Sequence, residues 1–259
     1  MRITTFASGS SGNCALISSG KTHLLMDAGI SMKRILCGLN RQGLDLSHIH
    51  GILITHEHSD HIQALPMLIK NHHPDIYAPR TVANALLRRI AGAEDCVHII
   101  PVGEAFSLDN FRITAFPTPH DTDESVGYRL EDGVRFGFCT DTGHVSEEMI
   151  ASLCGCDSVV IEANHDVELL LAGRYPYPLK KRILDPNGHL SNDDCAGLAC
   201  LLAENGTRQI TLGHLSKENN RPALARDTVR RALDDAGFAA VELRVAAPDG
   251  DVSWEVGPC

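Results

Sequence analysis

The stretch Thr55-His56-Glu57-His58-Ser59-Asp60-His61 determines how the rest of the chain is interpreted. The apolar run Gly51-Ile52-Leu53-Ile54 directly before it is typical of a buried strand. After it, apolar side chains recur at helical spacing, at Ile62, Leu65, Leu68 and Ile69. The stretch is therefore expected at the end of a strand, on a turn that enters a helix over about 61–70.

The composition of this turn indicates a metal site. It holds three histidines and an aspartate, His56, His58, Asp60 and His61, within six residues. Neutral imidazole and carboxylate groups are suitable ligands for Zn²⁺, Mn²⁺ or Fe. A strand that ends in such a dense group of nitrogen and oxygen ligands predicts metal-dependent chemistry at the strand end.

The motif resembles that of the metallo-β-lactamase-fold hydrolases. This resemblance implies an α/β fold, an αββα sandwich of two mixed sheets flanked by helices, with the site at one edge of the two sheets. In that family the first two histidines hold one metal and the Asp-His pair holds a second. The resemblance therefore implies a dinuclear centre, if further ligands follow downstream.

Three polar positions that each follow an apolar strand supply those ligands. His120 follows residues 111–116, Asp141 follows residues 134–139, and His214 follows residues 209–212. By the resemblance, metal one is held by His56, His58, His120 and Asp141, and metal two by Asp60, His61, Asp141 and His214. His189 stands in a similar Gly-His-Leu-Ser context and is the alternative to His214 as the last ligand.

Such a centre would hydrolyse a bond with an activated water. Two divalent ions about 3.5–4 Å apart can clamp the attacking and leaving oxygens, and they lower the pKa of a bound water toward about 7, giving hydroxide. Asp60 could orient that hydroxide as well as bind metal. Glu162 and His165 are candidates for orienting ligands or moving protons, and His189 for positioning a phosphate or protonating a leaving group.

The charge of the chain argues against a grip on nucleic acid through global electrostatics. The net charge is -10 and the isoelectric point is about 5.7, so phosphate contacts must come from a local patch. Candidate contacts are Lys180, Lys181 and Arg182. The Ser/Gly loop with Ser10, Ser11 and Asn13 could receive an anion on its backbone N–H groups and hydroxyls.

One domain over residues 1–259 is expected, because the chain shows no linker, charge block or low-complexity segment. Strands and helices alternate, which is typical of sheets covered by helices. Ser31 is expected to begin a helix, Glu131-Asp132-Gly133 to form a hairpin turn, and residues 174–192 to form a Pro- and Tyr-bearing loop.

The remaining features indicate a soluble cytoplasmic protein without a membrane segment. The nine cysteines are odd in number and include no C-x-x-C, which favours free thiols. Cys154-Gly-Cys156 could bind metal, but packing of small residues is the favoured interpretation. The N-terminus has no long apolar stretch of the kind that a signal peptide needs. The sequence leaves the oligomeric state open.

The metal motif alone does not decide the substrate. Five segments together resemble the bacterial YycJ/WalJ branch of the family, which is associated with 5′-to-3′ exonuclease action on DNA: 8–13, 55–61, 162–166, 188–192 and 212–220. The resemblance implies DNA as the substrate. The alternatives are a phosphodiesterase for cyclic or small phosphate esters, a glyoxalase-type thioesterase, and a non-enzymatic, metal-dependent sensor of a phosphorylated ligand.

Overall fold

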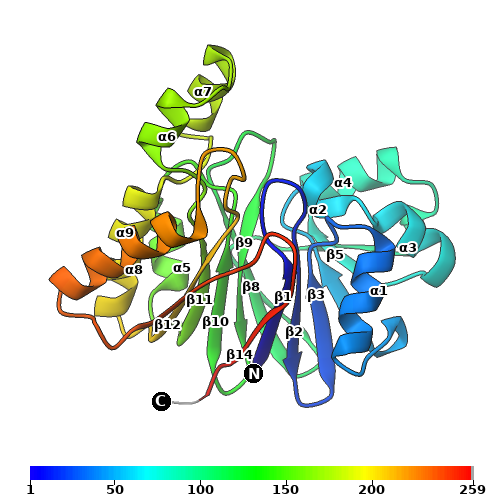
Figure 1. Cartoon of the computed structure of the whole chain (residues 1–259). Coiled ribbons are helices and arrows are strands. Elements are labelled where there is room, and N and C mark those ends of the chain that lie inside the picture. Colours follow the sequence, from blue (N-terminus) through cyan, green and yellow to red (C-terminus); the bar gives the residue numbers. More distant parts are fainter. Residues whose placement is uncertain (258–259) are drawn as a thin grey trace.

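The computed structural model describes residues 1–257, which form two sheets packed face to face with helices on their outer sides (Figure 1). Within these residues each sheet has seven strands, and both sheets are mixed. The first sheet contains, in spatial order, β14 (Val252–Glu255), β1 (Arg2–Ala7), β2 (Cys14–Ser19), β3 (Thr22–Met26), β4 (Gly51–Leu53), β5 (Ile76–Pro79) and β6 (Val97–Ile100). The second contains β13 (Glu242–Val245), β12 (Gln209–Gly213), β11 (Ser158–Glu162), β10 (Arg135–Cys139), β9 (Val126–Glu131), β8 (Phe111–Pro117) and β7 (Ala105–Leu108). The predicted αββα sandwich is confirmed.

The helices follow from the strand pairing. β3 to β6 run parallel, as do β10 to β13, so their connections must cross over the sheets. The connections of the first sheet contain α1 (Met32–Arg41), α2 (Ser59–Ile62), α3 (Leu65–His72), α4 (Arg80–Arg89) and two 3₁₀ turns, Leu46–His48 and Ala93–Asp95. Those of the second contain α5 (Glu147–Leu153), α6 (Val167–Ala172), α7 (Tyr177–Ile183), α8 (Asn192–Glu204) and α9 (Pro222–Asp235). Among residues 1–257, none of these helices is both long enough and apolar enough to cross a bilayer.

Apolar side chains fill three layers. Leu24 and Phe136 are fully buried between the two sheets. Leu68 of α3 and Leu86 of α4 pack in the apolar layer on the outer face of the first sheet. Leu198 of α8 packs in the corresponding layer of the second sheet. Because central strands are covered on both faces, they read as continuous apolar runs rather than alternating ones.

Prolines explain two wrong predictions of helix and loop. The helix expected over 61–70 is divided into α2 and α3, because Pro66 stands in the first turn of α3 and cannot donate a backbone hydrogen bond. The expected loop over 174–192 instead contains α7, with Pro178 in its first turn. A proline is tolerated there because the N–H groups of the first turn have no partner inside the helix. β7 and α6 were not expected from the sequence.

The cysteines within residues 1–257 are free thiols. Cys156 is buried in the apolar layer beneath α5 and α8, and Cys154 packs against that layer. In the same part of the chain, no group of neighbouring metal-ligand atoms contains a cysteine. Cys259 lies outside the described residues. The packing interpretation of the Cys-Gly-Cys segment fits this arrangement.

One edge of the sandwich collects the loops of both sheets. Gly9, after β1, pairs with Leu215, after β12. Nearby, Ser8 Oγ accepts a hydrogen bond from the backbone N–H of His214 at 2.9 Å. The ends of the two sheets are thus joined where the polar loops lie, with α6 and α7 beside them at the top of the view (Figure 1).

Candidate metal centre

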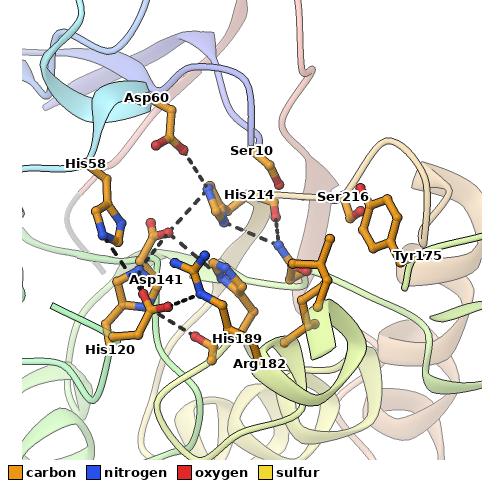
Figure 2. A pocket seen from close by; sticks show the side chains of 15 residues that line it. Ser10, His58, Asp60, His120, Asp141, Tyr175, Arg182, His189, His214 and Ser216 are labelled. Carbon is orange, nitrogen blue, oxygen red and sulfur yellow. Dashed lines mark hydrogen bonds and ion pairs between the residues drawn. The ribbon is translucent and has the colours of Figure 1, made fainter. Parts of the chain in front are cut away.

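The predicted ligands of the two sheets meet in one cavity of about 320 Å³ (Figure 2). His58, Asp60, His120, Asp141 and His214 line it. His56 and His61 are fully buried and do not line the cavity, and their ring centroids lie 4.1 Å apart. Within residues 1–257, ligand atoms that lie within 4.8 Å of one another form these groups: His56, His58 and His120; His56, His61 and Asp141; Asp60, His61 and His214; Asp141, Glu162, His189 and His214.

Four buried histidines have their Nδ1 atoms engaged by the protein. The partners are Thr55 Oγ1 for His56 at 3.0 Å, Asp27 Oδ2 for His61 at 2.8 Å, the Gly188 carbonyl for His120 at 3.1 Å, and Glu162 Oε1 for His214 at 2.9 Å. Carboxylate and carbonyl oxygens accept, and the Thr55 hydroxyl donates its own proton to Asp27, so Nδ1 of each ring donates. Each ring is then left with Nε2 as its possible ligand atom, which is the arrangement that orients metal-binding histidines.

Buried atoms at the centre lack hydrogen-bond partners. Within the described part of the chain these include His56 Nε2, His214 Nε2 and Asp141 Oδ2. Unpaired buried polar atoms are costly. Asp141 and His214 also have positive φ angles, 59° and 55°, which side chains other than glycine rarely adopt. Strained backbone that holds unpaired ligand atoms close together fits a cation between them.

The charges at the centre require a positive counterpart. Burial raises the pKa of Asp141, but His214 and His61 outweigh it and hold that pKa well below its usual range. In turn, burial lowers the pKa of His214, but Asp141, Asp60 and Glu162 raise it to about 10. The carboxylates are therefore ionised, and either protons on the imidazoles or bound cations must balance them.

Unlike His214, His56 and His120 have lowered pKa values, because burial dominates at both. Burial holds the pKa of His56 well below its usual value, with the neighbouring His61 acting in the same direction. Burial also lowers the pKa of His120. These two imidazoles are neutral at pH 7, which is the form that binds metal.

Glu162 and His189 form a pair beside the ligands. Glu162 is fully buried, accepts from the backbone N–H of Thr142 at 2.8 Å, and lies 2.8 Å from His189 Nδ1. Burial raises the pKa of Glu162, but His189 and His214 lower it to about 2. Burial lowers the pKa of His189, but Glu162 outweighs it and raises that pKa. His189 lines the cavity, so a protonated imidazole can face a bound molecule.

His165, a predicted catalytic residue, lies outside the cavity lining. It is buried and does not line the cavity, and within residues 1–257 neither ring nitrogen has a hydrogen-bond partner. Burial lowers its pKa. Its backbone carbonyl accepts from Asn192 N at 2.9 Å, where the loops after β11 and before α8 pair. Direct proton transfer from His165 to a molecule in the cavity is therefore not supported.

The predicted phosphate contacts are only partly at the cavity. Ser10 lines it, Ser11 is exposed beside it in the chain, and Asn13 is buried, with its amide nitrogen 3.1 Å from His61 Nε2. In the basic run the three side chains differ. Arg182 lines the cavity, Lys180 donates to the Leu171 carbonyl at 2.6 Å, and Lys181 is exposed outside the lining.

Three residues at the centre have no role in the sequence-based assignment. Asp121 Oδ1 lies 3.3 Å from His120 Nε2, and the other oxygen accepts from Arg182, which ties α7 to the cavity. Asp27 holds His61 and also accepts from the backbone N–H of Thr55 at 2.9 Å. Tyr175 forms part of the wall. Asp121 directly follows a predicted ligand and Asp27 directly follows the apolar run Leu24-Leu25-Met26, so position along the chain could have indicated both.

Comparisons with known proteins agree with this geometry. The beta-lactamase superfamily domain matches residues 22–215. The chain is 36% identical to the exodeoxyribonuclease YycJ of Bacillus anthracis over 93% of its own length and 92% of that protein. It is 40% identical to the exodeoxyribonuclease WalJ of Streptococcus pneumoniae serotype 2 over 96% of its length and 95% of that protein.

This chain belongs to the beta-lactamase superfamily. The alignments with YycJ and WalJ cover 93% and 96% of this chain. The crystal structure of the metallo-beta-lactamase fold protein YhfI from Bacillus subtilis superposes with a TM-score of 0.76, covering 98% of this chain and 99% of that one. At 16% identity that likeness concerns the fold alone.

Proposed function

We propose that this chain is a metal-dependent exodeoxyribonuclease that removes nucleotides from DNA 5′ ends. The main support is the 36% and 40% identity to two exodeoxyribonucleases over more than nine tenths of the chain. The nitrogen and oxygen ligand atoms gathered in the cavity are consistent with it. The 5′ polarity comes from the resemblance of the polar segments to the YycJ/WalJ branch.

The centre would hold two divalent cations. His56, His58, His120 and Asp141 are the proposed ligands of metal one, and Asp60, His61, Asp141 and His214 those of metal two. Asp141 Oδ1 lies 3.9 Å from His120 Nε2 and 3.4 Å from His214 Nε2, which suits a bridging carboxylate. With imidazole and carboxylate ligands and no thiolate, Zn²⁺ and Mn²⁺ are the proposed ions.

When bound, two such cations polarise a phosphoryl group and lower the pKa of water to about 7. The residues of the chain would position the phosphate and supply a proton to the leaving group. Glu162 orients His189 and raises its pKa, which favours the protonated imidazole, so His189 would donate a proton to the departing oxygen of a cleaved phosphodiester. Arg182 and the loop at Ser10 line the cavity where they can contact phosphate. Asp60, which lines the cavity, would orient the attacking water as well as bind metal.

A substrate panel tests the proposal. Purified protein with Mn²⁺ is incubated with end-labelled duplex DNA, single-stranded DNA, RNA, a cyclic dinucleotide and a glutathione thioester, with Asp141→Asn as the inactive control. The proposal predicts stepwise shortening of DNA by the wild type and none by the variant. Intact DNA together with rapid thioester hydrolysis would establish the glyoxalase-type alternative instead. No turnover of any substrate by a metal-loaded protein would favour the sensor.

A further inference from the structure

The cavity has an apolar wall opposite the candidate ligands. Tyr175, Leu179 and Ile183 form it, and all three come from α7 or the segment before it. In Figure 2, Tyr175 lies beside Ser216, on the far side of the cavity from His58 and His120. A molecule whose phosphate lies at the ligands would therefore extend toward an aromatic ring.

The Tyr175 ring is available to a ligand. Its side chain is half-buried and makes no hydrogen bond or aromatic contact with any other residue of 1–257. Pro176, at the N-cap of α7, has φ -62°. A proline restricts its own φ and also the conformation of the residue before it. The backbone that carries the ring is thus restricted, and a tyrosine side chain has only two torsions to fix when it binds a ligand.

The chemistry of the wall suits a nucleobase. An aromatic face with two aliphatic neighbours offers a flat apolar surface, whereas Ser10, Asn164 and Ser216 offer hydroxyl and amide groups around it. The cavity volume of about 320 Å³ is at the lower end of those that hold small ligands, and is more than a bare phosphate needs. Bases of any sequence stack on aromatic side chains, because every base has a π-face.

We propose that Tyr175 stacks on the base of the terminal nucleotide of the DNA strand being degraded. The inference rests on the proposed nuclease function and adds the subsite that receives the strand end. α7 closes this side of the cavity, and its Arg182 is tied to Asp121 next to the candidate ligand His120. Because this wall closes one side of the cavity, a terminal nucleotide would fit there, whereas an internal segment of the strand would not.

Binding of a mononucleotide tests the subsite without any need for turnover. Calorimetry of the metal-loaded protein compares 2′-deoxyadenosine 5′-phosphate with 2-deoxyribose 5-phosphate, which lacks the base. The variants are Tyr175→Ala, Tyr175→Leu and Tyr175→Phe. Tyr177→Ala is the matched control, since Tyr177 is 78% exposed on the same segment and outside the cavity lining.

The wild type is expected to bind the nucleotide about 5- to 150-fold more tightly than the sugar phosphate, the range that base–aromatic stacking spans. Tyr175→Ala and Tyr175→Leu should abolish this difference and leave sugar phosphate binding unchanged, while Tyr175→Phe and Tyr177→Ala should retain it. Equal nucleotide binding by the wild type and Tyr175→Ala would overturn the inference, as would an equal loss for both ligands.

A DNA assay separates failure of the subsite from failure of the proposed function. Wild-type cleavage of DNA with a normal terminal base should exceed that of DNA with an abasic terminal residue, and Tyr175→Ala should remove the preference. Normal cleavage with no preference would overturn the subsite and leave the nuclease function standing. Tight nucleotide binding by a protein that cleaves no DNA would overturn both, because the cavity would then serve a free nucleotide.

Discussion

His189 and His214 direct their Nδ1 atoms to the same oxygen, Oε1 of Glu162, at 2.8 and 2.9 Å. The two rings lie 5.3 Å apart, centroid to centroid. One buried carboxylate therefore orients both a candidate metal ligand and a candidate proton donor. The two similar Gly-His-Leu-Ser segments thus meet at a single carboxylate, and we expect their histidines to have different roles.

The two histidines should be separable by mutation. His189→Asn is expected to retain both metals and lose turnover by about 10²–10⁴-fold, the usual contribution of general acid–base catalysis. His214→Asn is expected to lose metal as well, because its Nε2 lies 3.7 Å from Asp60 and 3.4 Å from Asp141. Metal content by mass spectrometry, measured beside the turnover rate, distinguishes the two variants. A His189 variant that loses metal while the His214 variant keeps it would reverse the assignment.

Asp27 should act on the metal only through His61. Asp27→Asn removes the charge that holds His61 Nδ1–H at 2.8 Å and leaves a side chain of nearly equal size. Metal affinity is expected to fall about 10- to 100-fold, the usual effect of losing a residue that orients a ligand. Competition with a chelator measures this affinity, and Asp45→Asn, at the exposed cap of the 3₁₀ turn Leu46–His48 and outside the cavity lining, is the control. Unchanged affinity in Asp27→Asn would mean that His61 needs no such support.

Metal uptake should release protons. In the metal-free protein, burial lowers the pKa of His61, but Asp141 and Asp27 raise it well above its usual value, and the pKa of His214 is about 10. Both imidazoles are therefore protonated at pH 7 and must lose those protons to bind a cation. Affinity should rise with pH across the neutral range and fall in acid. Calorimetry in buffers of different ionisation enthalpy counts the protons, and a count near zero would contradict these pKa values.

Binding of DNA should depend only weakly on salt. With a net charge of -10 and few cationic groups at the cavity, about 2–4 phosphates would be neutralised, so the slope of log K against log salt should be roughly -2 to -4. Arg182→Ala should reduce that slope by about 1 without changing metal content. Lys181→Ala tests whether the exposed neighbour contributes as well. Lys70→Ala, on α3 and outside the cavity lining, should behave as wild type.

The metal cluster was predictable because its ligands occupy loops that directly follow apolar strands. His120, Asp141 and His214 each come one to three residues after a strand, and strand ends meet at a sheet edge. The apolar runs themselves revealed the buried strands of both sheets. The positions of these residues directly after apolar runs were therefore enough to predict that they lie together at the cavity.

Contacts made by α6 and α7 were not predictable in the same way. Prolines and charged residues interrupt the segment after α6, so residues 174–192 have the composition of a loop, although α6 itself is a short apolar run, Val167–Ala172. Helix α7 forms because its prolines occupy the N-cap and first turn, where they are tolerated. The burial of His165 and the pairing of Arg182 with Asp121 depend on where this segment packs, which no local pattern encodes.

The release of label from DNA during metal titration tests the central claim most directly. Metal-free protein receives zero to three equivalents of Mn²⁺, and the release of mononucleotides from 5′-labelled and 3′-labelled strands is followed over time. The account predicts early release of the 5′ label as a mononucleotide, activity that saturates at two ions per chain, and none of either in Asp141→Asn. Saturation at one ion with full activity, or DNA that survives at two, would contradict a dinuclear exodeoxyribonuclease.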